Sequence, residues 1–137
     1  MTTESECIFC KIVAGDVPAE KIYEDDRTIA FMDVNPGTRG HALVIPKRHA
    51  KDLLEIDPDE LAAVTRSAQT VSRRAMERLE ADGINLLNCC GAEAWQTVFH
   101  FHLHIVPRYV DDPLQLPWIP APGEPDEIAE TAKLLRD

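Results

Sequence analysis

Three histidines stand at every second position of one short run, residues 99–106. They are His100, His102 and His104, and the residues between them are apolar. In a β-strand, alternate side chains point to the same face, so the three imidazoles would share one face and the apolar residues would take the other. Neighbouring imidazoles would then lie roughly 6 to 7 Å apart, a spacing that suits one phosphate between them. Because burying three titratable rings together without a use is costly, we interpret this strand as a site of chemistry.

The central histidine of the run, His102, is the expected nucleophile. A neutral imidazole is nucleophilic near pH 7 without a partner base, and it leaves well from phosphorus. Attack on an α-phosphorus would expel a leaving group, and water would then hydrolyse the phospho-histidine. Such a transfer depends mainly on positioning and charge stabilisation. The loop before the run carries Gln96 and Thr97, and we expect these side chains and the loop N–H groups to be the oxyanion donors.

Two hairpin strands, a third strand and a long helix precede this run. Residues 21–24 and 28–32 read as a β-hairpin, and residues 40–45 as a third strand closed by Pro46. Asp57 is an expected N-cap, followed by Pro58 at the first helical position. An apolar stripe at spacings of three and four then runs to the end of the helix before Asp82. Its members are Leu61, Val64, Ala68, Val71, Ala75 and Leu79.

The remaining elements are shorter. Residues 7–14 are apolar and end at Gly15, which predicts a short helix. Residues 84–89 predict a fourth strand, and the histidine run is the fifth, ended by Pro107. Residues 111–125 are rich in proline and predict an extended arm, followed by a last helix from about residue 124 to 135.

Composition and charge limit the partners of the chain. Its 137 residues predict one domain, and 45% hydrophobic with 28% charged residues is typical of a soluble globular protein. A net charge of −10 argues against binding to nucleic acid, which requires clustered Lys and Arg. No apolar run approaches the roughly 20 residues of a membrane span. The N-terminal residues 1–6 are acidic, unlike a signal peptide, so we expect a cytoplasmic protein without a membrane partner.

Several segments together resemble the histidine triad (HIT) superfamily. The run 100–106 has the alternating His-apolar form of that family, and residues 8–12, 24–26, 31–36 and 41–49 are similar to its Hint-like branch. The likeness covers roughly residues 7–108. It implies an α+β fold with a five-stranded antiparallel sheet, a homodimer, and a cleft that hydrolyses or transfers nucleoside monophosphates through a nucleotidyl-histidine. We therefore predict a HIT domain over residues 1–110, with the arm and C-terminal helix, residues 111–137, as part of the same domain.

The resemblance also assigns roles to single residues. It makes His102 the nucleophile and places His104 on the α-phosphate, while His41 and Asn88 match family residues near the phosphate and ribose. It makes Asp33 the acceptor for the ribose hydroxyls. An apolar slot for the base would be formed by Ile8, Phe9, Ile12, Phe31, Val34 and Leu43. A flat heterocycle needs apolar walls and few polar anchors, which this set offers.

A Cys-x-x-Cys motif, Cys7 and Cys10, predicts half of a tetrahedral zinc site. The other half must be histidine or carboxylate. His49 and His100 are the candidates, because the resemblance assigns the other two histidines of the run to phosphate. Some bacterial relatives are similar in carrying such a zinc, and unligated cysteines are the alternative. Four protein ligands leave no open position for water, so the zinc would be structural and would tie the N-terminal segment to the histidine run.

One residue departs from the family pattern. Trp95 stands where the family more often has a small residue, commonly glycine, whose backbone approaches the phosphate. A bulky ring there would narrow or cover the pocket and shift substrate preference.

The sequence is compatible with three functions. The first is a hydrolase of purine nucleoside phosphoramidates or related adenylates. The second is a nucleotide-binding regulatory module with little catalysis, which the altered loop at Trp95 favours. The third, a catalytic metal centre built from imidazoles, is weaker because the histidines and cysteines divide more naturally between a structural metal and a substrate. A homodimer is expected from the family and from an exposed apolar stripe on the long helix.

Overall fold

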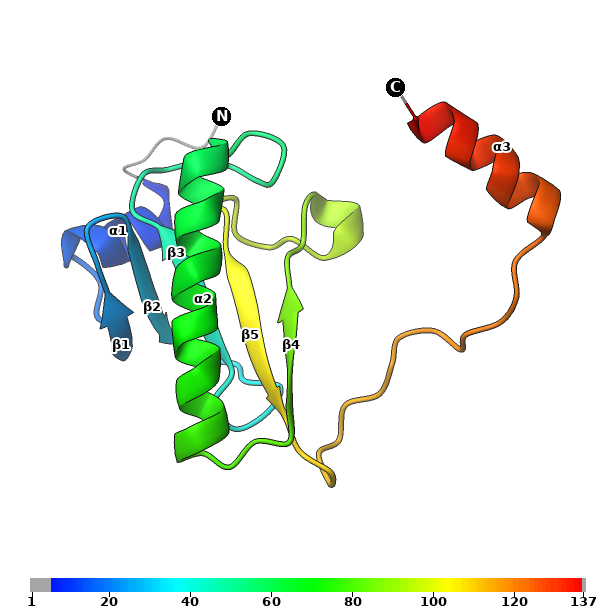
Figure 1. The fold of residues 1–137 in the computed structure, drawn as a ribbon. Helices are drawn as coiled ribbons and strands as arrows, with labels where there is room; N and C mark the ends of the chain where they lie inside the picture. Colours follow the sequence, from blue (N-terminus) through cyan, green and yellow to red (C-terminus); the bar gives the residue numbers. More distant parts are fainter. Residues whose placement is uncertain (1–5, 137) are drawn as a thin grey trace.

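A five-stranded antiparallel sheet forms the centre of the molecule (Figure 1). A computed structural model describes residues 6–136, so most of the acidic N-terminus lies outside the described residues. The strands follow the order β1-β2-β3-β5-β4 across the sheet, which confirms the predicted fold class. Their bounds are β1 Lys21–Glu24, β2 Thr28–Met32, β3 Ala42–Pro46, β4 Gly83–Leu87 and β5 Leu103–Arg108.

The predicted hairpin is formed by β1 and β2, and its turn is fixed by Asp25. One carboxylate oxygen of Asp25 accepts the backbone N–H of Arg27 at 2.9 Å and that of Thr28 at 2.8 Å. A side chain that closes its own turn in this way replaces backbone hydrogen bonds that the turn lacks. The second strand then pairs along its whole length with β3, which places Leu43 opposite Phe31.

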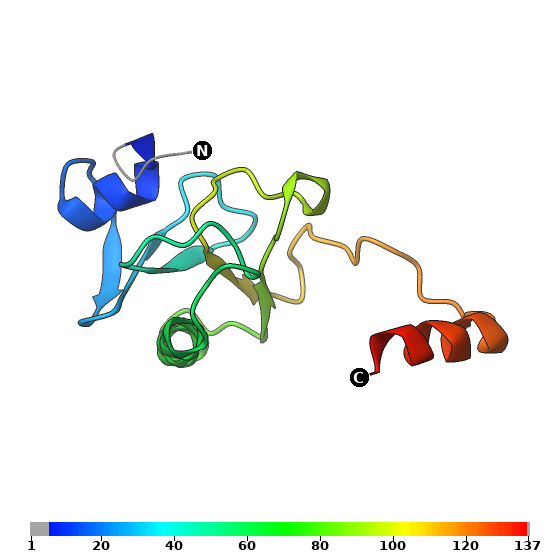
Figure 2. The same cartoon turned by 90° about the horizontal axis from the view of Figure 1, so that it is seen from above.

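The long helix α2, Pro58–Arg78, covers one face of the sheet (Figures 1 and 2). It begins as predicted, because the side chain of Asp57 accepts the N–H of Asp59 at 2.8 Å and proline occupies the first turn. Its fully or nearly buried apolar side chains are Ala63, Val64, Ala68, Val71 and Ala75.

The burial of this stripe corrects one expectation. Val64 and Ala68 belong to a core cluster with Val44, Phe101 and Ile105 of the same chain. The stripe was expected to be exposed and available to a second copy. It instead covers the sheet of its own chain. The apolar face of that sheet is the nearest apolar surface, so the stripe and the sheet bury each other.

The opposite face of the sheet carries the N-terminal helix α1, Ile8–Ala14. The helix ends at Gly15, whose φ of 83° is the left-handed conformation that glycine tolerates best. Its inward residues Phe9 and Ile12 form a second core cluster with Phe31 and its neighbours on β2 and β3. Strand alternation separates the two clusters, so β2 and β3 are buried on both faces.

The fifth strand is shorter at its start than predicted and longer at its end. β5 begins at Leu103, so His100 and His102 lie just before the strand and only His104 lies within it. The ladder does not reach further because the N–H of Phe101 donates to the carbonyl of Ala50, at 2.7 Å, instead of to a strand. The alternation of faces is nevertheless kept, since Phe101, Leu103 and Ile105 all pack in the core under α2.

Pro107 does not end the strand as predicted. It pairs with Ile84 of β4, and the strand continues to Arg108. Pairing with β3 has already stopped at Ile105, so the missing N–H of proline breaks no ladder hydrogen bond on that side.

Beyond the sheet, an extended arm leads to the last helix, α3 Pro125–Leu135, as predicted. The side chain of Glu124 caps α3 by accepting the N–H of Glu127 at 2.9 Å. Figure 1 shows α3 standing apart from the sheet, and none of its residues is buried. That the arm belongs to the same domain as residues 1–110 stays a prediction. No helix within residues 6–136 combines the length and the apolar character needed to cross a membrane.

Candidate active site and metal site

The central histidine has a defined tautomer. Nδ1 of His102 lies 2.8 Å from the carbonyl oxygen of His100. A carbonyl can only accept, so Nδ1 carries the hydrogen and the lone pair of the neutral ring is on Nε2. The His102 residue is only 5% exposed, and this burial lowers the pKa of His102 below its ordinary value. The ring is therefore neutral near pH 7 and nucleophilic at Nε2.

A second tautomer is fixed by a relay of hydrogen bonds that starts at Gly37. The N–H of Gly37 donates to Nδ1 of His41 at 2.9 Å, so the hydrogen of a neutral His41 is on Nε2. That Nε2 lies 2.9 Å from Nδ1 of His104 and donates to it. The remaining hydrogen of His104 is thus on Nε2.

The neighbouring rings of His102 and His104 therefore offer opposite groups, a lone pair on Nε2 of His102 and a hydrogen on Nε2 of His104. The ring centroids of His102 and His104 are 5.1 Å apart, somewhat closer than the predicted strand spacing. Burial, with the nearby rings of His102 and His41, lowers the pKa of His104 to about 4. A neutral nucleophilic nitrogen and a neutral N–H donor thus lie side by side, which is an arrangement suited to a phosphate.

Two polar residues predicted for the ribose lie beside this pair. Oδ2 of Asp33 is 3.4 Å from Nε2 of His41, while its Oδ1 accepts the N–H of Asn35. Asn88 donates through Nδ2 to the carbonyl of His102 at 3.0 Å. Its Oδ1 is buried and accepts no hydrogen bond from any described residue. A buried acceptor without a partner is costly, so this oxygen is a ready acceptor for a ligand hydroxyl.

The predicted base slot divides into a packed part and an exposed part. Phe9 and Phe31 meet edge to face with centroids 5.5 Å apart, and Phe9 also meets His102 at 5.1 Å. Ile12 and Leu43 are buried in the same cluster, and Leu43 lies opposite His104 in the β3–β5 pairing. Phe9 and Leu43 therefore lie next to the histidines, and Ile12 and Phe31 belong to the same buried cluster.

The other two members of the slot are on the surface. Ile8 is 47% exposed and Val34 is 89% exposed. The structure thus does not bury them with the other four.

The loop before the histidines is braced by Gln96. Its Oε1 accepts the N–H of Gly91, and its Nε2 donates to the carbonyls of Lys51 and Val98. Both Nε2 hydrogens, which were expected to face an oxyanion, are here donated to backbone carbonyls. The neighbouring Thr97 is exposed, so its hydroxyl is accessible to a ligand.

Trp95 adopts a backbone conformation that bulky residues rarely take. Its φ is 75°, its N–H donates to the carbonyl of Ala92 at 3.0 Å, and its side chain is 66% exposed. A β-carbon in the left-handed region costs free energy that glycine avoids. Glycine at this position would relieve that strain, because it has no β-carbon.

The four residues of the predicted zinc site, Cys7, Cys10, His49 and His100, come together behind the histidine run. Nε2 of His100 donates to the carbonyl of Pro46 at 2.8 Å, which leaves the lone pair of Nδ1 facing the other three. Metal-ligating histidines are commonly oriented by such a second hydrogen bond. Burial lowers the pKa of His100 to about 4, which keeps the ring in its ligating, neutral form.

The spacing of these ligand atoms fits a zinc ion. Nδ1 of His100 lies 3.2 Å from Nδ1 of His49 and 3.4 Å and 3.5 Å from the sulfurs of Cys7 and Cys10. A further pair, Cys10 Sγ and His49 Nδ1, is 3.3 Å apart. A zinc tetrahedron has edges of about 3.3 Å between nitrogens and about 3.6 Å between nitrogen and sulfur. These four distances therefore match edges of a zinc tetrahedron, and all four ligand atoms lie within 4.8 Å of one another.

The sequence pattern of the HIT domain matches residues 14–111, which include the histidine run. This chain belongs to the HIT domain family. Among its relatives is the Bacillus subtilis protein named Protein hit, 42% identical over 109 residues, which are 80% of this chain and 75% of that protein. Membership of the family was predicted and is confirmed.

Two further relatives bear on the site of this HIT protein. The adenylylsulfatase HINT3 of Arabidopsis thaliana is 41% identical over 107 residues, 78% of this chain and 54% of that protein. A crystal structure of a zinc-bound histidine triad family protein from Mycobacterium smegmatis is 45% identical, with a TM-score of 0.79 over 87% of this chain and 86% of that one.

Sequence reasoning missed the backbone groups that define the histidine tautomers of this HIT domain. The N–H of Gly37 and the carbonyls of Pro46 and His100 orient three of the rings. Every residue has such groups, so no residue type marks them. The turn chemistry of residues 35–37 was the one available signal, since it places a tight turn next to His41.

Proposed function

We propose that this HIT protein is a purine nucleotide-binding hydrolase or nucleotidyl transferase that cleaves nucleoside phosphoramidates or related adenylates. The observation that carries the proposal is the lone pair on Nε2 of His102, fixed by the hydrogen bond from its Nδ1 to the carbonyl of His100. The relationship to an adenylylsulfatase supports an adenylate as the substrate class.

In the first step, Nε2 of His102 attacks the α-phosphorus. The new N–P bond forms as the bond from phosphorus to the leaving nitrogen or oxygen breaks. The leaving group departs with that electron pair, and a leaving nitrogen takes up one proton from water to form the free amine. The N–H on Nε2 of His104 is the donor for the charge that builds on the phosphoryl oxygens. The ring of His102 becomes cationic, and the carbonyl that accepts its Nδ1 hydrogen stabilises that charge.

In the second step, water attacks the same phosphorus from the side opposite His102. The N–P bond breaks, its electron pair returns to Nε2, and the water releases one proton as the nucleoside monophosphate forms. Transfer to an acceptor other than water would follow the same path. The carbonyl of His100 keeps the ring in one orientation through both steps, so no reorganisation is needed between them.

The nucleoside would be held by groups on both sides of this phosphate. The carboxylate of Asp33 and the unpartnered Oδ1 of Asn88 are acceptors for ribose hydroxyls. Phe9 and its buried neighbours such as Phe31 would contact the base, since Phe9 packs against the ring of His102 and Phe31 packs against Phe9.

A zinc ion held by the cluster of Cys7, Cys10, His49 and His100 would have a structural role. When bound, it would cross-link the chain, and its four protein ligands would leave no coordination position open for water. Phe9 lies between the two cysteines, and His100 is two residues from the nucleophile. The cluster would therefore fix the base slot against the catalytic residue.

The experiment is turnover of an adenosine phosphoramidate with AMP as the measured product. The wild-type protein should release AMP, and His102→Ala should lower kcat by about 10³-fold or more, because it removes the nucleophile. His102→Ala should still bind AMP in calorimetry, which shows that the slot is intact. Absence of turnover by the wild type, or equal turnover by the variant, would overturn the proposal.

A second candidate function is a nucleotide-binding regulatory module with little catalysis. The exposed Trp95 in the loop before the histidine run and the near-complete burial of His102 favour it. The same two measurements separate the functions, because the module would bind AMP at micromolar concentration and form no product.

We also propose a homodimer, on the basis of the family. Sedimentation velocity at micromolar concentration measures it, and a single monomeric species would contradict it.

A further inference from the structure

A groove lies between β1, the C-terminal half of α2 and the turn before β3. Its volume is about 400 Å³, which is within the range of small-molecule sites in proteins. None of the residues that line it belongs to the histidine site or to the cysteine cluster. The groove is therefore separate from the chemistry proposed above.

The wall of the groove is aliphatic. Ile22 and Met32 come from the β1–β2 hairpin, and Val71, Ala75 and Leu79 come from α2 and its C-cap. The last three recur at a spacing of four residues, which places them on one helix face. Ile22 is 37% exposed, so the groove leaves apolar surface open to water. A ligand with a hydrocarbon part would be stabilised by covering this surface.

Three arginines line the same groove, and no acidic residue does. Arg74 and Arg78 are four residues apart on α2 and are neighbours on its surface, while Arg39 comes from the turn before β3. Within residues 6–136, the side chains of Arg39 and Arg78 form no ion pair and no hydrogen bond. Arg74 donates once, to the carbonyl of Ile22 at 3.1 Å, which leaves four of its five N–H groups. The groove thus offers cationic donors beside an aliphatic wall.

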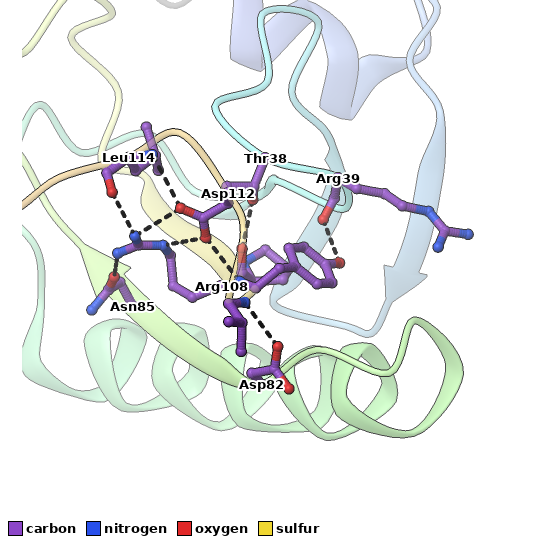
Figure 3. Close-up of polar contacts among 10 residues, drawn as sticks. Thr38, Arg39, Asp82, Asn85, Arg108, Asp112 and Leu114 are labelled. Atoms are coloured by element: carbon purple, nitrogen blue, oxygen red, sulfur yellow. Dashed lines mark hydrogen bonds and ion pairs between the residues drawn. The ribbon is translucent and has the colours of Figure 1, made fainter.

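The turn that carries Arg39 is held in place by β5 and the residue after it (Figure 3). The hydroxyl of Thr38 donates to the carbonyl of Pro107 at 2.6 Å. The hydroxyl of Tyr109 donates to the carbonyl of Arg39 at 2.8 Å. Figure 3 shows the side chain of Arg39 extending away from these bonds. The backbone of Arg39 is therefore fixed, which lowers the entropy that a ligand must remove.

A glycine brings this turn against the end of α2. Gly40 has a φ of 89°, and a β-carbon there would lie 2.5 Å from Cδ1 of Leu79. Both the conformation and the lack of space exclude a larger residue. This close approach lets Arg39 and the two arginines of α2 line one groove from two elements.

The two kinds of lining residue select the two parts of a ligand. A guanidinium binds a carboxylate through two parallel N–H···O bonds, which are stronger than hydrogen bonds between neutral groups. The aliphatic wall binds a hydrocarbon chain by removing apolar area from water. A nucleoside fits this wall poorly, because the polar groups of its base and sugar would find no partners there.

We propose that the groove is a binding site for a small aliphatic carboxylate. The hydrocarbon chain lies against Val71, Ala75 and Leu79, and the carboxylate is bound by the arginines. The site shares no residue with the nucleotide chemistry proposed above, so either proposal can fail without the other.

Calorimetry of the full chain with decanoate at pH 7 measures the binding, and decanamide is the neutral ligand of the same length. Decanoate should bind with one molecule per chain and roughly ten-fold more tightly than decanamide. Butyrate should show no measurable binding, because each CH₂ group that it lacks contributes about four-fold in affinity. Absence of decanoate binding, or equal affinity for decanamide, would overturn the proposal.

Two methionines report where the ligand binds. Met32 lines the groove, whereas Met76 is a 43% exposed residue of α2 outside it. In protein with ¹³C-labelled methionine methyl groups, decanoate should shift the NMR signal of Met32 and leave that of Met76 unchanged. Met32→Leu assigns the signal. Equal shifts of both signals would show unspecific coating of the surface, and no shift of Met32 would place the ligand elsewhere. Either result would overturn the site.

The part of the arginines is tested by a pair of charge reversals on α2. Arg78→Glu should lower the affinity for decanoate at least ten-fold and leave that for decanamide unchanged, because only the carboxylate contacts the guanidinium. Arg73→Glu changes the charge of the protein equally at an exposed position outside the groove, and it should bind decanoate like the wild type. Equal loss in both variants, or loss in neither, would overturn the contact between the carboxylate and the arginines.

Discussion

The Nε2 hydrogen of His41 is donated to Nδ1 of His104 across 2.9 Å, and it is committed to that direction because the N–H of Gly37 occupies the other nitrogen of His41. The relay sets which nitrogen of His104 presents a hydrogen to a ligand. The backbone N–H of Gly37, which is far from His102 in the sequence, thereby decides whether His104 offers a hydrogen or a lone pair to the ligand.

Removal of the relay should weaken catalysis more than binding. His41→Ala leaves Nδ1 of His104 without a donor, so the ring can adopt the tautomer that turns a lone pair toward the phosphate. We expect kcat for an adenosine phosphoramidate to fall roughly 10- to 100-fold with little change in KM. His41→Gln, whose amide can supply an N–H, is the matched variant and should recover part of kcat. Steady-state kinetics of the two variants measures this, and equal kcat values would exclude the relay.

The low pKa of His104 should make the protein less stable in mild acid. Its pKa is lowered from 6.5 to about 4, so between these values the unfolded chain binds a proton that the folded ring does not. Stability therefore falls as the pH decreases through this window and is fully present above it.

The change in Tm between pH 7 and pH 5 measures this effect. His104→Gln removes the titrating group while other histidines remain, so its Tm should fall less than that of the wild type over the same interval. Identical changes in Tm would show that His104 does not contribute.

The architecture was predictable from local patterns, whereas the exact use of the histidines was not. Hairpin turns, the N-cap at Asp57 and the proline arm each depend on residues close in sequence, and all three were predicted correctly. The start of β5 depends on the N–H of Phe101 choosing the carbonyl of Ala50, a contact across 51 residues that no local pattern encodes. The apolar stripe of α2 is a similar case. Its spacing of three and four residues predicts that one helix face is buried, but not which surface packs against that face.

The candidate site shows the same division. Side chains with distinctive chemistry, such as Cys7, Cys10 and the histidines, could be selected by type, and the structure brings the four predicted metal ligands together. The separation of Ile8 and Val34 from the buried slot could not be predicted, because apolar residues are common on surfaces as well as in cores.

Zinc should be bound at about one ion per chain and should stabilise the fold. Cys7→Ser should lose the metal in elemental analysis and lower Tm, because the contact between α1 and the histidine run is then held by packing alone. Cys89→Ser, a buried cysteine outside the cluster, is the control and should keep the metal. Retention of zinc by Cys7→Ser, or a wild-type protein purified without it, would contradict the site.

The metal and the chemistry should also be separable. Cys7→Ser should keep part of its phosphoramidate turnover, since zinc held by four protein ligands offers no position for water. Complete loss of turnover in a variant that remains folded by circular dichroism would instead indicate a catalytic metal.

Replacement of Trp95 should stabilise the protein only when the new residue is glycine. The φ of 75° at this position strains any residue with a β-carbon, and Trp95→Gly should therefore be more stable than Trp95→Ala by about 1 kcal/mol. Both variants lose the exposed indole, so their difference isolates the backbone. Urea unfolding of the two variants measures it, and equal midpoints would mean that the loop relaxes without cost. Because Trp95 lies in the loop that leads into the histidine run, both variants should shift the ratio of kcat/KM between bulky and small leaving groups in the same direction.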